Sequence, residues 1–221
     1  MCLYIIEIEK KCQYIYCIFF KIFIKFLIIM NQDKKAIREY IKAVIPIDLK
    51  LKQSASLSIN NSFIKKGYIT NCDVILSYMN LNDEVSIFND KLSSYHPLFI
   101  PRIIKGTNEI EFHKYSNNLK IGEYNILEPI ETSEKFSFDK KYNKITIFVP
   151  GRAFTTDGIR LGRGKGYYDR FLQKLIQSYT RERLNIIGVC FKEQLQETLP
   201  FEEHDIKMDD VVFDSNNNLL I

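Results

Sequence analysis

The hydrophobic pattern predicts two helices early in the chain. Residues 33–45 place their apolar side chains three and four positions apart, and Pro46 ends the pattern. Lys34 and Arg38 are four residues apart on the polar side of this helix, so they share one face. A second helix is expected over residues 48–69, although its serine-rich middle weakens the pattern.

Two more helices are expected further along. Asn82 or Asp83 can cap a helix that continues to Leu92. From Tyr167 onward the apolar residues again fall on one helical face. They are Phe171, Leu172, Leu175, Ile176 and Tyr179.

Runs of β-branched and aromatic residues predict strands. Buried strands are expected at residues 73–78, 97–101, 145–149 and 185–191. Polar and apolar residues alternate over 110–115, which indicates an antiparallel pair covering one edge of the sheet. The chain is expected to finish with a hairpin formed by residues 210–213 and 218–221.

Residues 145–191 follow the order strand, glycine-rich loop, helix and strand. Such a unit implies two parallel strands joined by a right-handed crossover. The expected fold class is therefore α/β, a single three-layer domain with a mostly parallel central sheet and helices on both faces. Ligands of such sheets bind outside the carboxyl ends of the strands, so the glycine-rich loop is the expected site.

The first thirty residues stand apart from the domain expected over residues 31–221. Residues 12–30 are mostly apolar, but Lys21 and Lys25 interrupt them, and each lysine costs about 2.5 to 3.5 kcal/mol at the centre of a membrane span. Three interpretations of this hydrophobic N-terminal extension, residues 1–30, stay open. They are an extension upstream of a start at Met30, an uncleaved anchor or organelle signal, and an amphipathic helix.

Composition narrows the functional classes. Hydrophobic residues make up 46% of the chain and charged residues 26%, as in ordinary globular proteins. The net charge of +4 falls to about +2 without the first thirty residues, which hold four lysines and two glutamates. This charge is too small to indicate a nucleic-acid-binding surface. The five cysteines form no CxxC pair, which indicates a reducing compartment, and Cys72 and Cys190 are expected to be buried.

The strongest chemical signal is the run RLGRGKGYYD at residues 160–169. Its three alternating glycines let the backbone approach a ligand, and its N–H groups, with the following helix N-terminus, can cradle an anion. Arg160, Arg163 and Lys165 would repel one another unless an anion of several charges, such as a polyphosphate, lay among them. The alternative is a tight turn with a solvated basic tip. The spacing matches neither a Walker loop nor a dinucleotide fingerprint.

Asp169 lies in the first turn of the helix beside this loop. There it could hold a magnesium ion that bridges phosphates. The alternative is simple complementarity with the helix dipole, worth roughly 0.3 to 1 kcal/mol.

The same region carries a family resemblance. The run VPGRAFTTDGIRLGRGKGYYDRFL, residues 149–172, resembles the signature segment of the 5-formyltetrahydrofolate cyclo-ligases, also called methenyltetrahydrofolate synthetases. Lys34 to Arg38 is similar to the family's opening basic motif, and Tyr78 to Val85 is similar to its substrate-side segment. The resemblance covers about residues 32–213.

The resemblance implies an activity and a fold. The family closes a ring in an ATP- and Mg²⁺-dependent reaction that turns 5-formyltetrahydrofolate into 5,10-methenyltetrahydrofolate and releases ADP and phosphate. Its scaffold is related to phosphosugar isomerases of the NagB and RpiA type and to CoA transferases. Because the attacking nitrogen belongs to the folate, such a protein needs phosphate clamps more than a nucleophile of its own.

Site residues carried over from the resemblance fall into four groups. Those implied to bind ATP are Lys34, Arg38, Arg160, Leu161, Gly162, Arg163, Gly164, Lys165, Gly166, Tyr167 and Tyr168. Lys165, Arg163 and Tyr167 are implied to lie nearest the reacting groups, and Met79, Glu84 and Tyr168 to meet the folate. Asp169 and Asp205 are implied to bind Mg²⁺.

Plainer interpretations of some of these residues remain. Glu84 could be a carboxylate in the first turn of a helix, and Asp205 an ordinary loop acid. Three departures from the family pattern, at Arg152, Thr155 and Asn125, are expected to touch none of the implied contacts.

Two other functions compete with the cyclo-ligase. One is an isomerase or CoA transferase, which would need a general base near the loop. The other is a non-catalytic relative that binds RNA through the basic loop. The expected protein is a cytoplasmic monomer that binds small molecules and no nucleic acid. A mitochondrial or other organelle location, or a membrane contact, would follow only from residues 1–30.

Overall fold

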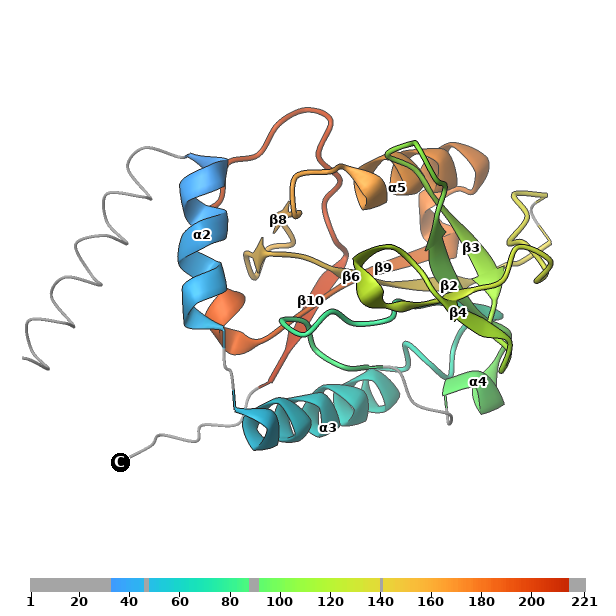
Figure 1. The fold of residues 1–221 in the computed structure, drawn as a ribbon, viewed down its shortest axis with the longest axis horizontal. Helices are drawn as coiled ribbons and strands as arrows, with labels where there is room; N and C mark the ends of the chain where they lie inside the picture. The colour runs from blue at the N-terminus through green and yellow to red at the C-terminus, as the bar shows by residue number, and fades with distance from the viewer. Residues whose placement is uncertain (1–32, 46–47, 88–91, 140, 215–221) are drawn as a thin grey trace, which may run out of the picture.

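A computed structural model describes residues 33–45, 48–87, 92–139 and 141–214. Its centre is a six-stranded sheet in the order β10-β9-β6-β1-β2-β3 (Figure 1). The strands are β1 (Val74–Leu76), β2 (Leu98–Ile103), β3 (Ile110–Lys114), β6 (Ile145–Pro150), β9 (Leu184–Cys190) and β10 (Asp210–Phe213). Neighbouring strands are parallel except for β2 and β3, which confirms the expected α/β class and mostly parallel sheet.

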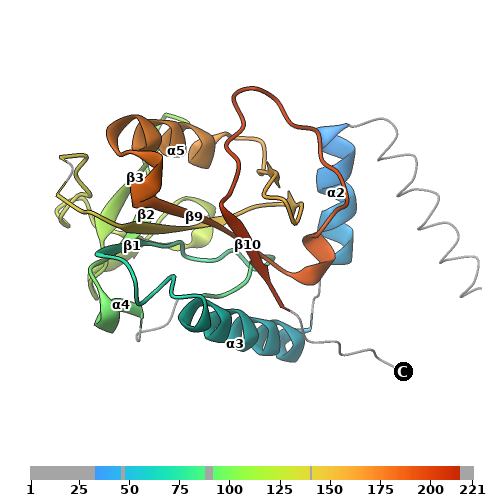
Figure 2. The same ribbon diagram turned by 180° about the vertical axis from the view of Figure 1, so that it is seen from behind.

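Helices cover both faces of the sheet. Helix α3 (Leu49–Lys65) lies on one face and α5 (Tyr167–Ser178) on the other, as Figures 1 and 2 show from opposite sides. Side chains of β1 alternate between these layers, with Ile75 packed on the α3 side and Val74 and Leu76 on the α5 side. Strand alternation therefore produces two hydrophobic cores from one sheet.

Helix α2 (Lys34–Val44) stands beside the sheet rather than on a face of it (Figure 1). The Asp33 side chain caps it by accepting the Lys35 N–H at 2.8 Å, and Ile37 and Ile41 are buried. The opposite, polar side of the helix is thereby directed away from the core. The predicted helix is confirmed, and its polar side carries Lys34 and Arg38.

The connection from β6 to α5 contains a small hairpin that the sequence pattern did not indicate. It consists of β7 (Ala153–Phe154) and β8 (Arg160–Leu161), with Gly158 in its turn. A second hairpin lies outside the main sheet, formed by β4 (Leu119–Ile121) and β5 (Leu127–Pro129). A short 3-10 helix, η1 (Glu123–Asn125), forms its tip.

Three expectations about local structure need correction. Residues 82–84 form a turn and 85–87 are not helical, so the helix predicted from Asn82 or Asp83 to Leu92 is wrong there; only the short α4 (Leu92–Tyr95) follows. Helix α3 ends at Lys65, four residues before the predicted end, because Gly67 turns the chain with φ 75°. Strand β10 pairs in parallel with β9, and residues 218–221, its expected hairpin partner, lie outside the described residues.

The 3-10 turn η2 (Arg181–Arg183) precedes β9 in the chain, and the 3-10 turn η3 (Lys192–Gln194) follows it. Cys72 and Cys190 are buried free thiols, as predicted. Across the described residues, no helix has both the length and the apolar character needed to span a membrane. The extension at residues 1–30 lies outside that part of the chain.

Candidate active site

A cavity of about 360 Å³ opens at the carboxyl ends of β1, β2 and β6. This is the edge of a parallel sheet where ligands are expected. One part of its wall is apolar and includes Met79, Ile103, Ile110 and Ile126. The other part is polar and is built from the glycine-rich loop, the first turn of α5 and the segment after β1.

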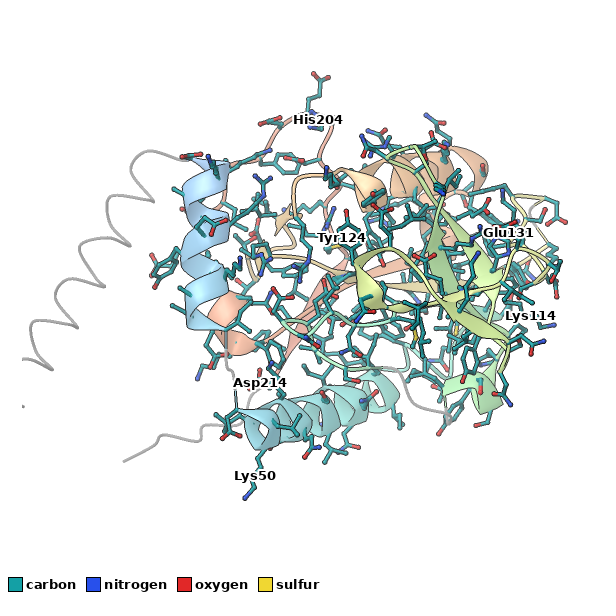
Figure 3. The ribbon with its side chains drawn as sticks, in the orientation of Figure 1. Lys50, Lys114, Tyr124, Glu131, His204 and Asp214 are labelled. Atoms are coloured by element: carbon teal, nitrogen blue, oxygen red, sulfur yellow. The ribbon has the colours of Figure 1, made fainter. Side chains whose placement is uncertain are left out.

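Tyr124 lines the cavity from the tip of the β4–β5 hairpin. Its backbone and that of Asn125 have positive φ values of 61° and 58°, which non-glycine residues seldom adopt. The ring is about half exposed and lines the cavity. In Figure 3 Tyr124 lies over the middle of the molecule, whereas His204 lies at its outer edge. The cavity can therefore receive a flat, largely apolar ligand next to a charged one.

Arginine side chains from outside hold the glycine-rich loop in place. Arg38 of α2 donates from Nε to the carbonyl of Gly162 at 2.8 Å. Arg170 of α5 donates to the carbonyl of Lys165. Gly166, with φ 69°, forms the N-cap of α5, so the loop leads directly into the positive end of the helix dipole. The loop is thus shaped as an anion cradle by contacts that leave its N–H groups available.

Arg160 is buried below the loop and pairs with Asp169. Its Nη2 lies 2.5 Å from Asp169 Oδ1, and its Nη1 donates to the Pro150 carbonyl at 3.1 Å. The guanidinium carbon lies 5.9 Å from the centre of the Tyr168 ring. Arg160 therefore braces the base of the site and holds Asp169 in position at the cavity wall.

Arg163 pairs with two carboxylates that follow β1. Its Nη2 lies 2.5 Å from Asp83 Oδ1, and its Nε donates to Glu84 Oε1 at 2.8 Å. Burial alone would raise the pKa of Asp83, but hydrogen bonds from Arg163 and Arg152 outweigh it and lower the pKa to about 2. Glu84 is the more deeply buried carboxyl, and burial raises its pKa although Arg163 opposes the effect.

These ion pairs show that the loop cations do not all need a bound anion to offset their mutual repulsion. Three neighbouring cations were expected to require a bound anion, but Asp169 neutralises Arg160, and Asp83 and Glu84 neutralise Arg163. Lys165 is exposed at the loop tip, and no carboxylate of the described residues forms an ion pair with it. The cation free to meet a phosphate in this structure is therefore Lys165.

Lys34 does not line the cavity. Its Nζ lies 2.9 Å from Glu202 and 3.1 Å from Asp205, on the segment between β9 and β10. Burial lowers the pKa of Lys34, but hydrogen bonds to Glu202 and Asp205 more than compensate and raise it. Lys34 thus links α2 to Asp205 at the rim of the site.

The two tyrosines at the start of α5 are both protonated near neutral pH. Burial and a hydrogen bond with Tyr124 raise the pKa of Tyr167 to about 12. Burial, followed by the nearby charge of Glu84, raises the pKa of Tyr168 well above its usual range. Each hydroxyl can donate a hydrogen bond to an oxygen of a ligand in the cavity.

Most of the residues implied by the resemblance converge on this cavity. The cavity wall contains Met79, Glu84, Arg160, Gly162, Arg163, Lys165, Gly166, Tyr167, Tyr168 and Asp169. Leu161 is buried in the core beside the loop, and Gly164 lies next to Arg38 with φ 100°. Arg38 touches the loop from outside the cavity, whereas Lys34 and Asp205 pair with each other and do not line the cavity.

Sequence reasoning missed several residues of the wall. Arg152 was expected to touch none of the implied contacts, yet its N–H donates to the Leu161 carbonyl at 2.7 Å, so that expectation is wrong. Its side chain also lines the cavity and pairs with Asp83 at 2.6 Å. Asp83 was expected only as a possible helix cap and as part of the segment that resembles the family's substrate side. Tyr124 and Glu128 come from the region with the weakest periodicity, where no pattern pointed to them. Arg152 departs from the family pattern, and this departure was the one feature of the sequence that could have indicated these residues.

The described residues contain no group of three histidine, cysteine or acidic side chains able to enclose a metal by themselves. Magnesium, however, is commonly held by one or two carboxylates together with phosphate oxygens and water. Asp169 keeps its second oxygen, Oδ2, free of hydrogen bonds from the described residues and lines the cavity. The donor set therefore fits a magnesium ion that arrives with a nucleotide, with Asp169 better placed than Asp205.

None of the three histidines lines the cavity. His113 is buried and bonded to the Ser133 carbonyl and to Glu111, which is a structural role. His204 is exposed and close to Glu202 at 3.4 Å. His96 lies in the segment before β2.

Comparisons with known proteins agree on one family. Residues 30–214 match the model of the 5-formyltetrahydrofolate cyclo-ligase family. The chain is 28% identical to the mouse 5-formyltetrahydrofolate cyclo-ligase over 198 residues, which cover 85% of this chain and 96% of the relative. It is 39% identical over 67 residues to the Saccharomyces cerevisiae 5-formyltetrahydrofolate cyclo-ligase, covering 30% of this chain and 32% of that protein.

A solved structure is similar as well. The 5,10-methenyltetrahydrofolate synthetase of Aquifex aeolicus superposes with a TM-score of 0.68 at 26% identity. The match covers 83% of this chain and 90% of that one. Sequence and fold therefore point to the same relatives.

Proposed function

The chain belongs to the 5-formyltetrahydrofolate cyclo-ligase family, whose members use ATP to convert 5-formyltetrahydrofolate into 5,10-methenyltetrahydrofolate, and from this premise we propose how its cavity performs the reaction. The observation that carries the proposal is the junction of two surfaces in one cavity. The loop and the α5 N-terminus offer an anion cradle, and the adjoining wall is apolar. A nucleotide phosphate chain and a folate ring can meet at that junction.

The triphosphate of ATP binds the glycine-rich loop in this proposal. Lys165 and the loop N–H groups contact the phosphates, and Arg38 keeps the loop in shape through the Gly162 carbonyl. Met79 and the neighbouring isoleucines contact the folate rings, while Glu84 accepts hydrogen bonds from the pterin N–H groups. Arg163 lies between the ATP side and the folate side of the cavity, because it belongs to the loop and pairs with Glu84.

The chemistry then requires positioning more than a protein nucleophile. The formyl oxygen attacks the terminal phosphorus of ATP, and ADP leaves. The folate N10 then attacks the activated formyl carbon and releases its proton to solvent, and phosphate leaves with the former formyl oxygen. Charge develops on phosphoryl oxygens in both steps, so Lys165, Arg163 and the hydroxyl of Tyr167 stabilise it at the mouth of the loop.

Magnesium belongs to the proposal through Asp169, whereas Asp205 is bound by Lys34 and does not line the cavity. When bound near Asp169, the ion would neutralise part of the phosphate charge. Asp169 is held by Arg160, so its carboxylate is already oriented at the cavity wall.

Replacing Asp169 with asparagine tests this assignment. Asp169→Asn is expected to lower turnover and to raise the Mg²⁺ concentration needed for half-maximal activity at least several-fold, because one anionic ligand is lost. The buried Arg160 would lose its partner, so the melting temperature should fall too. A Mg²⁺ titration of initial rates measures the first effect. An unchanged Mg²⁺ requirement at reduced activity would leave Asp169 with a structural role only.

The function itself is tested by a spectrophotometric assay. Methenyltetrahydrofolate absorbance is followed with 5-formyltetrahydrofolate, with and without Mg-ATP, for the full chain and for residues 30–221. An ATP-dependent signal of equal size from both proteins is expected. Folded protein without any signal at either length would favour a non-catalytic relative, and salt-sensitive RNA binding would then be the next measurement.

We propose further that the protein works as a monomer in the cytoplasm, with an organelle as the alternative should residues 1–30 act as a targeting segment. Sedimentation of the full chain at several concentrations would test this.

A further inference from the structure

Arg152 lines the cavity, yet the steps above make no use of it. It follows β6 directly, and its side chain is only 9% exposed. Its backbone N–H donates to the Leu161 carbonyl at 2.7 Å. Its carbonyl accepts a hydrogen bond from Gln194 Nε2 at 3.1 Å, and the same amide also donates to the Gly151 carbonyl at 2.9 Å. Because Gln194 is fully buried, the Arg152 backbone is fixed.

The side chain of Arg152 reaches Asp83. Its Nη1 donates to Asp83 Oδ2 at 2.6 Å, while the other carboxylate oxygen is bound by Arg163 Nη2 at 2.5 Å. Asp83 therefore lies between two guanidinium groups, each on its own oxygen. Arg163 continues the series to Glu84. Four charged side chains thus connect the end of β6 to the glycine-rich loop.

The charges of this series balance only when Arg152 is present. Two arginines face two carboxylates, so the sum is zero when all four are ionised. Without Arg152, one arginine would face two carboxylates beside the place where phosphates bind. Charges in a partly buried cavity are weakly screened by salt, so the excess negative charge would repel an anionic ligand.

We infer that Arg152 is a positioning residue of this enzyme. It neutralises and holds Asp83, so that Arg163 and the glycine-rich loop keep the orientation in which they meet the phosphates of ATP. The inference rests on the proposed function for the identity of the ligand. It assigns to Arg152 no contact with the reacting atoms.

A double-mutant cycle tests whether Arg152 acts through Asp83. The values of kcat and KM for ATP are measured for the wild type, Arg152→Gln, Asp83→Asn and the double variant. Arg152→Gln is expected to lower kcat/KM by about tenfold or more, mainly through KM, because an uncompensated carboxylate remains. The double variant removes that carboxylate, so it should be more active than Arg152→Gln alone. If the two single-variant losses in kcat/KM simply multiply in the double variant, the inference is overturned. A kcat/KM of Arg152→Gln within twofold of the wild-type value would overturn it too.

Matched variants separate positioning from stability. Arg181 forms an exposed ion pair with Asp209 at 2.7 Å, and neither residue lines the cavity, so Arg181→Gln should keep wild-type kinetics. Arg152→Lys keeps the charge and should recover most of the KM effect. If Arg152→Gln does not fold, the same cycle is run with Arg152→Met, which also removes the charge, and losses that multiply in the double variant would again overturn the inference.

A binding measurement distinguishes failure of this inference from failure of the proposed function. Calorimetric titration with Mg-ATP gives a dissociation constant for each variant without any turnover. Absent turnover by the wild type would contradict the proposed function alone. Equal ATP affinity and equal KM in wild type and Arg152→Gln would contradict the role of Arg152 alone.

Discussion

Lys165 stands out at the residue scale because no carboxylate among the described residues pairs with it. It is exposed at the loop tip, whereas Arg160 and Arg163 are each held by carboxylates. Lys165→Ala is therefore expected to reduce kcat by about a hundredfold or more, since a charge-assisted phosphate contact is lost where charge develops. Its melting temperature should stay within about 2 °C of wild type, because exposed side chains contribute little stability.

Lys174→Ala provides the matched control for that experiment. Lys174 lies on α5, the helix that follows the loop, and pairs with Glu109 on the surface at 3.0 Å. Its replacement should leave kcat and KM unchanged. A Lys165→Ala enzyme with wild-type kcat would exclude the loop tip from the mechanism.

Asp83 makes a second prediction at this scale, which concerns pH. Folding lowers its pKa from 3.8 to about 2, so its ionised form stabilises the folded state above the unfolded pKa. That contribution, about 2 kcal/mol at most, is lost as pH falls from about 4 to 2. Glu84 has a raised pKa and the opposite sign, so wild-type stability alone would mix the two effects.

The comparison of wild type with Asp83→Asn isolates the effect. Urea unfolding at several pH values between 6 and 2 gives the free energy of unfolding of each protein. The difference between them should be constant above about pH 5 and should shrink toward pH 2. A difference that is independent of pH would mean that Asp83 does not lose its charge in this range.

The sequence indicated the charged groups of the site better than their partners. Arg160, Arg163 and Lys165 are adjacent in the chain and easy to find, and the cavity does contain all three. Their carboxylates come from α5 and from the turn after β1, up to 80 residues away. Pairing across such a separation depends on sheet order, which a local pattern does not contain.

At the scale of elements, the turn of the β7–β8 hairpin gives a clear prediction. Gly158 has φ 97°, and a Cβ there would lie 2.4 Å from the Met208 carbonyl oxygen. The Met208 N–H also donates to the Gly158 carbonyl at 2.8 Å, so the two backbones are pinned together. Gly158→Ala is expected to lower the free energy of unfolding by about 3 kcal/mol or more, since backbone strain and a backbone clash add.

Gly106 offers the matched control. It also has a positive φ, 79°, but no atom lies within 4 Å of the Cβ it would carry. Gly106→Ala should therefore cost only the strain, about 1 to 2 kcal/mol. Urea unfolding of both variants measures the difference, and equal losses would show that the contact with Met208 relaxes at no cost.

Elements with strong periodicity were predictable, and elements shaped by the site were not. Helices α2 and α5 and strands β6 and β9 occur where the pattern placed them, because each buries one continuous apolar face. The helix predicted after Asn82 is absent at residues 82–87 because local side chains take its backbone bonds. The Leu81 N–H donates to the Glu84 carboxylate, and the Tyr78 hydroxyl donates to the Val85 carbonyl.

At the scale of the whole molecule, the site joins segments that are distant in sequence. The glycine-rich loop is held by α2 through Arg38, by α5 through Arg170 and by the turn after β1 through Arg163. A ligand that contacts the loop therefore tightens contacts between three separate parts of the fold. Binding to the folded state alone also stabilises it by mass action.

Mg-ATP should consequently raise the melting temperature of the whole domain. At a concentration one hundred times its dissociation constant, the expected gain is about 2.7 kcal/mol. For a chain of this size that corresponds to roughly 5 to 10 °C. Scanning calorimetry with and without Mg-ATP measures the shift, with Lys174→Ala expected to match wild type and Lys165→Ala to lose most of the gain. Because the exposed Lys165 side chain forms no ion pair with the described residues, a full shift in Lys165→Ala would place the nucleotide away from the loop.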